Sequence, residues 1–146
     1  HDDIGTTKHY MPFKDINEAS VVYEEEAAFL MPFHGRVKSV SMRPNNITGT
    51  GNLTVDISRI DLGLGIFGSS NWSIVESETL AYAPGDGNHC FHFVFDLGKH
   101  FNAGQSISIG VQASTDPSNF IRWYVSAVIE FDPAGNLGDS SQEHEE

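Results

Sequence analysis

The segment at residues 89–96, HCFHFVFD, constrains the fold of this chain more than any other stretch of the sequence. Phenylalanine occupies every second position in it, at 91, 93 and 95. Because successive side chains of a β-strand point to opposite faces, the three rings share one face. This pattern predicts a strand whose aromatic ladder is buried against an opposing sheet.

Similar alternation recurs along the chain at intervals of about ten residues, which is typical of an all-β domain. We predict strands at 9–13, 37–43, 53–57, 71–81, 89–96, 106–112 and 120–131, and two short strand pieces within 21–31. No internal repeat and no convincing helical stripe interrupts this series. The sequence therefore predicts an antiparallel β-sandwich of about eight strands, with a jelly roll as the favoured topology. We expect the strands of the first half to form one sheet and the later strands to form the other.

The length of 146 residues fits one domain with one core. Residues 1–8 lack periodicity and are predicted to form an N-terminal arm, residues 9–132 the single sandwich, and residues 133–146 an acidic flexible tail. A start at His1 is expected for a piece processed from a longer product. The single cysteine, Cys90, excludes an internal disulfide, so packing must hold the fold together.

Charge restricts the partners of the chain. Eight Lys and Arg residues stand against twenty Asp and Glu residues, which gives a formal net charge of -12. Because phosphate-rich surfaces attract basic proteins, we expect neither nucleic acid nor an anionic membrane as a partner. No stretch approaches the roughly 18 uninterrupted apolar residues of a membrane-spanning helix.

No residue pattern in this sequence predicts catalysis, a metal or a cofactor. Cys90 and His92 lie two apart on one strand face, but no second pair with ligand spacing accompanies them, so we interpret the tract as part of a strand. Asp56, Asp61, Asp86 and the glutamates at 24–26 are interpreted as solvated surface charge, because acidic residues are frequent throughout. A G-x-S-x-G nucleophile motif is absent from the sequence.

Aromatic residues suggest a carbohydrate contact, since pyranose rings stack on flat aromatic faces. The candidate glycan contacts are Trp72, Tyr82, Trp123 and Tyr124. Core packing is the alternative interpretation for all four side chains. Trp123 and Tyr124 are adjacent and must point to opposite faces of their strand, so we expect one in the core and the other exposed.

A corner between two strands is predicted at residues 29–43, FLMPFHGRVKSVSMR. Pro32 fixes its own φ, and Gly35 is expected to supply the positive φ of a reversal. We expect Phe29, Leu30 and Val37 to belong to the core. The exposed residues of the corner and the following strand form a candidate docking face on an otherwise acidic protein, made of Phe33, His34, Arg36, Lys38 and Arg43.

Four short motifs stand out along the chain. They are YMPF at 10–13, FLMPFHGRV at 29–37, FNAGQSISI at 101–109 and VIEFD at 128–132. Together they resemble the small β-sandwich modules on the virion surface of marine tailed phages, including cyanophages, and the similarity covers most of residues 9–132. These modules serve as capsid decoration or cement proteins, or as head-fibre and fibre-knob domains.

The resemblance implies a non-enzymatic virion protein on the particle surface, with no catalytic residues to carry over. It also implies contacts with other virion proteins and a homo-oligomer, for which a trimer is one option. A receptor- or glycan-binding domain at a fibre tip is the alternative from a different class, and a hydrolase is the third.

Overall fold

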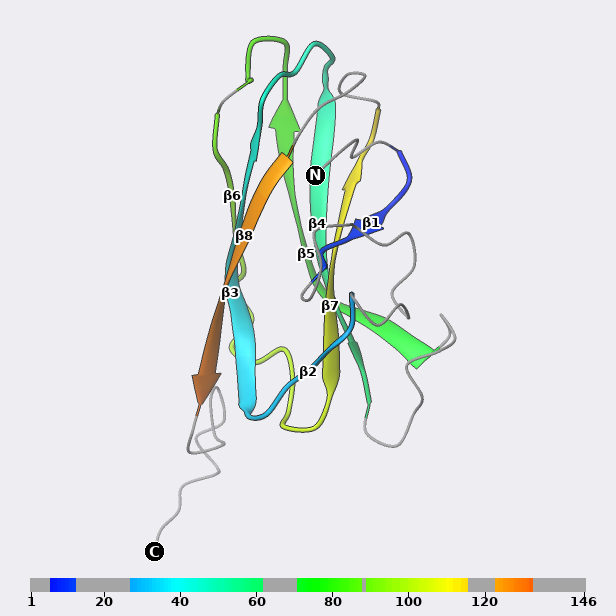
Figure 1. Ribbon diagram of the computed structural model, residues 1–146, viewed down its shortest axis with the longest axis vertical. Helices are drawn as coiled ribbons and strands as arrows, with labels where there is room; N and C mark the ends of the chain where they lie inside the picture. Colours follow the sequence, from blue (N-terminus) through cyan, green and yellow to red (C-terminus); the bar gives the residue numbers. More distant parts are fainter. Residues whose placement is uncertain (1–5, 13–26, 62–70, 88, 116–122, 133–146) are drawn as a thin grey trace, which may run out of the picture.

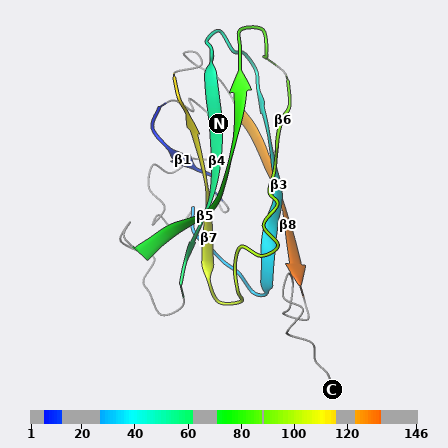
Figure 2. The ribbon, with the colours of Figure 1, turned by 180° about the vertical axis from the view of Figure 1, so that it is seen from behind.

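Two antiparallel β-sheets packed face to face make up the described part of the chain, as both views of the ribbon show (Figures 1 and 2). The computed structural model describes residues 6–12, 27–61, 71–87, 89–115 and 123–132. The strands are β1 (His9–Tyr10), β2 (Phe29–Leu30), β3 (His34–Pro44), β4 (Gly51–Ile60), β5 (Trp72–Tyr82), β6 (Phe91–Val94), β7 (Ser106–Ala113) and β8 (Trp123–Asp132). The predicted antiparallel β-sandwich of about eight strands is confirmed.

Strand order differs from the sequence-based prediction. One sheet has the order β1-β7-β4-β5, with β2 also paired to β7, and the other has the order β6-β3-β8. Each sheet therefore contains strands from both halves of the chain, so the prediction of one sheet per half is wrong. The chain crosses between the sheets after most strands, whereas β4 and β5 stay together as direct antiparallel neighbours. The jelly-roll topology is not confirmed.

The aromatic ladder lies in the core as predicted. Phe91, Phe93 and Phe95 are all buried, and so are the inward-facing Ile107 and Ile109 of β7 in the opposing sheet. Burying an aromatic or branched aliphatic side chain contributes about 2 kcal/mol to the free energy of unfolding. Because no disulfide crosslinks this chain, such burial provides the main stabilisation.

The corner after β2 carries the chain from one sheet to the other. Phe29 of β2 packs partly buried against the core and Val37 of β3 is fully buried, as predicted. Leu30 was predicted to be in the core, but it is 64% exposed. The reason is strand alternation, because Phe29 points inward and its neighbour must then point outward.

Gly35 is required for a close approach of chain segments, and not for the positive φ expected of it. Among the described glycines, positive φ occurs at Gly85 and Gly104. A side chain at Gly35 would overlap the carbonyl oxygen of Glu130 and lie 3.0 Å from the ring of Phe101. The Gly35 amide also donates to the Phe101 carbonyl oxygen at 3.1 Å. This glycine therefore lets β3 lie close to both β8 and the segment before β7.

A fully buried histidine links the two sheets. The Nδ1 of His100 accepts a hydrogen bond from the backbone N–H of Val37 on β3 at 2.9 Å. Nδ1 is therefore unprotonated, and Nε2 carries the proton that it donates to Glu76 on β5 at 2.7 Å. We call this arrangement of Val37, His100 and Glu76 the His100 clasp.

Glu76 is held as a carboxylate within the clasp. Its oxygens also accept hydrogen bonds from the backbone amides of Asp96 and Leu97, at 2.8 and 3.0 Å. Burial raises the pKa of Glu76, but the hydrogen bonds from His100 and these amides outweigh it and leave the pKa below its ordinary value. Burial lowers the pKa of His100 and exceeds the opposing effect of Glu76, so the imidazole stays neutral.

Asp56 was predicted to be solvated but is only 4% exposed. It forms a close ion pair with Lys8 and accepts a hydrogen bond from the hydroxyl of Ser77. Gly110 is in register with both Tyr10 and Asp56, and its missing side chain leaves room for Lys8 and Tyr10 to pass over β7. The end of the predicted arm therefore packs on the outer face of the larger sheet.

Several predictions concern residues outside the described ranges, namely the acidic bend at 24–26, most of the arm at 1–5 and the tail at 133–146. Within the described ranges, no helix is long and apolar enough to cross a membrane.

Replacing Gly35 with alanine should lower the free energy of unfolding by about 2 kcal/mol, because the new methyl group collides with the backbone of β8. Urea unfolding followed by tryptophan fluorescence measures the change. Ser126→Ala on the exposed face is the matched control and should leave the stability near that of the parent. An unchanged Gly35→Ala midpoint would contradict the close approach.

The His100 clasp should make the fold sensitive to acid. Folding lowers the pKa values of both His100 and Glu76. As the pH falls, the unfolded state therefore binds more protons than the folded state does. The free energy of unfolding should therefore decrease as the pH falls below the ordinary His value of 6.5, and decrease further below the ordinary Glu value of 4.5. Urea titrations at a series of pH values measure this dependence.

The control for that measurement is a pair of asparagine variants. His100→Asn should lower the free energy of unfolding by about 2 kcal/mol at neutral pH. The free energy of unfolding of this variant should also depend less on pH between neutral pH and about pH 5. His89→Asn should keep the parental dependence, because the His89 side chain is 66% exposed. Equal stability of the parent at neutral and mildly acidic pH would rule out a neutral buried His100.

Candidate functional site

The outer face of the three-stranded sheet is open and carries large apolar side chains. Val94 of β6 is 48% exposed, Tyr124 of β8 is 62% exposed and Val128 of β8 is 53% exposed. On the larger sheet, the outward-facing Asp56 and Ser108 are buried. Its large exposed apolar side chains, Leu30 and Ile74, lie on the short strand β2 and on the edge strand β5. The described structure therefore offers the surface of β3, β6 and β8 for contact with a partner.

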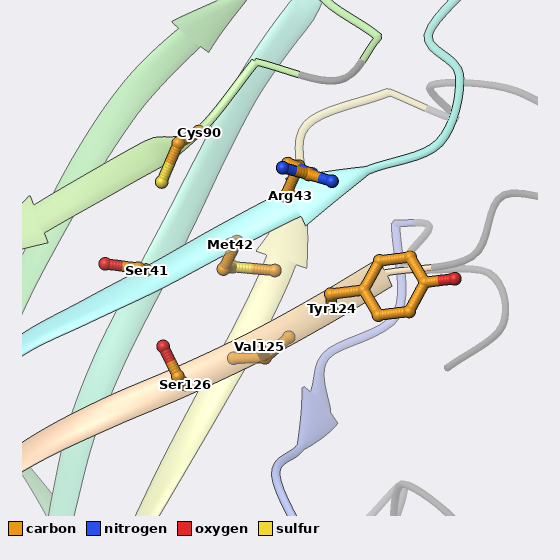
Figure 3. Close-up of a pocket in the computed structure, with 7 residues that line it drawn as sticks. All are labelled: Ser41, Met42, Arg43, Cys90, Tyr124, Val125 and Ser126. Atoms are coloured by element: carbon orange, nitrogen blue, oxygen red, sulfur yellow. The ribbon is translucent and has the colours of Figure 1, made fainter.

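A shallow groove of about 410 Å³ lies on this open face (Figure 3). Arg43 and Tyr124 are opposite each other in the pairing of β3 with β8, and Ser41 is opposite Ser126 in the same pairing. Cys90, just before β6, lies on the other side of β3. The lining residues are Ser41, Met42, Arg43, Cys90, Tyr124, Val125 and Ser126.

The groove combines one cation, several hydroxyl groups and one aromatic ring. Among the described residues, Arg43 has no ion-pair partner, so its guanidinium is available to an anion or a hydroxyl group. Ser41, Ser126 and Tyr124 line the same groove, and the hydroxyl of Tyr124 points away from the two serines (Figure 3). These groups are able to bind a polar ligand or a complementary protein surface.

A serine–histidine contact at the groove lacks the parts of a hydrolytic site. The Oγ of Ser41 lies 2.8 Å from Nδ1 of His92. Within the described ranges, no carboxylate pairs with His92 to orient the ring, which the triad arrangement of hydrolases requires. The contact is explained as a cross-strand hydrogen bond, because Ser41 and His92 are directly opposite in the pairing of β3 with β6.

The predicted docking face does not form one basic patch. Phe33, Lys38 and Arg43 are exposed, whereas His34 and Arg36 are half-buried. The Nε of Arg36 forms an ion pair with Glu130 of β8 at 3.0 Å, which neutralises its charge.

His34 is also engaged, since its Nδ1 lies 2.9 Å from Oδ1 of Asn102. Arg36 and Arg43 are seven positions apart on β3, a separation of roughly 24 Å along an extended strand. Only the Arg43 end of the predicted docking face reaches the groove.

The predicted glycan contacts are also dispersed. Tyr82 is buried, with its hydroxyl donating to the carbonyl oxygen of Thr115 at 2.8 Å, and Trp123 is buried beside the ring of Phe91. Trp72 is opposite Ile60, at the end of the larger sheet remote from Tyr82. Tyr124 alone combines exposure with a place in the groove. The prediction that one member of the Trp123–Tyr124 pair is in the core and the other exposed is confirmed.

Metal ligands do not cluster in the described structure. Cys90 and His92 are exposed, and Nδ1 of His89 lies 3.2 Å from Oδ1 of Asp86. Within the described ranges, no group of three or more His, Cys, Asp or Glu side chains is able to hold a metal ion.

The association of Arg43 with Tyr124 was missed at the level of sequence. The two residues were assigned to different candidate sites, because strand pairing between β3 and β8 joins segments about eighty positions apart and leaves no local signal. Their outward orientation was nevertheless readable from alternation with the buried Met42 and Trp123.

The chain matches no protein-family model, no curated protein and no solved structure, so arguments about its function rest on its own residues.

Proposed function

We propose that this chain is a non-enzymatic virion structural protein, acting as a capsid decoration or cement protein or as part of a head fibre on the particle surface. The observation that carries the proposal is the open face of β3, β6 and β8, where Val94, Tyr124 and Val128 are about half exposed or more. The resemblance of the four short motifs to virion-surface modules of marine tailed phages supports it.

Such a protein must stay soluble before assembly and make contacts with its neighbours after it. A net charge of -12 keeps free copies apart in solution, whereas exposed apolar side chains gain free energy when a neighbour covers them. The partners proposed are other virion proteins and further copies of this chain, which together form a homo-oligomer. The proposal includes no cofactor, no nucleic acid and no membrane.

A decoration protein should be present in virions in a copy number that matches the capsid lattice. Quantitative mass spectrometry of purified particles measures this number, with the major capsid protein as the internal standard. A copy number of only a few per particle would exclude the decoration role and leave the fibre role. Absence from the particle would contradict both, and turnover of a glycoside or ester substrate by the purified chain would contradict a non-enzymatic role.

A second candidate function is glycan binding at the tip of a fibre. The observation that favours it is the pairing of exposed Tyr124 with Arg43 in a groove bordered by serine hydroxyls (Figure 3). An aromatic ring provides a stacking surface for a sugar. A guanidinium without an ion-pair partner among the described residues favours a sugar that carries a carboxylate or sulfate group.

Glycan binding is tested on an array that contains neutral and acidic glycans. We expect acidic glycans to be preferred, and Tyr124→Ala or Arg43→Gln to weaken binding at least about tenfold, equivalent to about 1.4 kcal/mol. Lys38→Gln is the matched control, because Lys38 is an exposed cation outside the groove. No binding by the parent protein, or equal losses in all three variants, would eliminate this candidate.

A further inference from the structure

The four edges of the two sheets differ in how well they are protected against pairing with another chain. The β1/β2 edge consists of two strands of two residues each, and β6 has only four residues. The β5 edge is long but carries Glu76 and Glu78. The β8 edge has ten residues and no charge between Trp123 and Ile129. Short strands and charged side chains are the usual protection of a sheet edge, and β8 has neither over this stretch.

The free side of β8 is also poorly covered. β8 pairs with β3 on one side, and none of the described strands pairs with its other side. Its core-facing Val125, Ala127 and Ile129 are only partly buried, and its outward-facing Val128 is 53% exposed. Both faces of the strand therefore leave apolar surface next to an edge that no described strand pairs with, and a further strand at this edge would cover that surface.

We infer that two copies of this chain pair antiparallel through β8, around a two-fold axis at Ala127. A two-fold axis perpendicular to the sheet keeps the core-facing side chains of both copies on one side. Centring it at Ala127 uses the strand from Trp123 to Phe131, places Val125 opposite Ile129, and places Ser126 opposite Val128. The pairing joins two three-stranded sheets into one continuous sheet of six strands.

Local charges along β8, and not the net charge, support a second copy as the occupant of this edge. Two chains of net charge -12 repel each other, and the uncharged part of β8 is where their backbones are able to meet with least repulsion. The same register places Glu130 opposite Tyr124 of the second copy, whose neighbour on β3 is Arg43. Glu130 then lies between Arg36 of its own chain and the Tyr124–Arg43 pair of the other chain, so the two edges are complementary to each other.

The β8 dimer is one form of the self-association included in the proposed function. Only its biological role rests on that function. Because the dimer is measured on the isolated chain, its failure is distinguishable from a failure of the virion copy-number experiment. Sedimentation equilibrium over a wide concentration range should give a species with twice the mass of one chain. A monomer at all concentrations, or a trimer, would overturn the inference.

A double variant tests the position of the contact. Ser126→Lys with Val128→Lys places lysines opposite each other at two symmetric positions of the proposed interface, and should weaken the dimer at least about tenfold. Both side chains are exposed, so circular dichroism and the thermal midpoint should stay those of the parent. A folded double variant that dimerises like the parent would overturn the inference.

Two further variants test the register. Ser126→Glu with Val128→Lys places a glutamate opposite a lysine of the second copy, so dimerisation should be retained. Val94→Lys introduces a lysine on the same face but on β6, at the opposite edge of the sheet, and should leave the dimer unchanged. Loss of the dimer in the Glu/Lys variant, or an equal loss in Val94→Lys, would contradict pairing at Ala127.

Discussion

The arrangement of the two sheets depends on one buried imidazole. His100 accepts from the backbone of β3 and donates to Glu76 of β5, so a single side chain joins the sheets through two hydrogen bonds shielded from water. The close approach at Gly35 brings β3 near His100, since the amide of His100 also donates to the carbonyl oxygen of Gly35 at 2.9 Å. Because β3 is the central strand of the smaller sheet, the His100 clasp also positions the groove and β8.

The two outer faces of the sandwich differ in a way that bears on function. On the larger sheet, the ion pair of Lys8 with Asp56 crosses over Gly110 and closes part of the surface. The smaller sheet has no such cover over Tyr124 and Val128 in the described structure. The proposed contact with a partner therefore uses the smaller sheet, where Val94, Tyr124 and Val128 remain exposed to water.

Local patterns made the strands predictable, whereas contacts between distant segments were not predictable. Alternation was sufficient for the phenylalanine ladder and for the opposite orientations of Trp123 and Tyr124, since it depends on neighbouring residues alone. The division of strands between sheets depends on pairing across long sequence distances, and that prediction failed. The neutralisation of Arg36 by Glu130 has the same origin, because the two residues meet only through the pairing of β3 with β8.

Hydrogen exchange on the isolated chain and on assembled particles tests the central claim that the smaller sheet and its β8 edge form the assembly surface. At a concentration that keeps the isolated chain monomeric, we expect assembly to slow exchange in β8, whose outer edge is not paired with any described strand in one copy. Exchange in β5 should change little. Protection confined to β5 and the larger sheet, with β8 exchanging at the same rate in both states, would contradict the account.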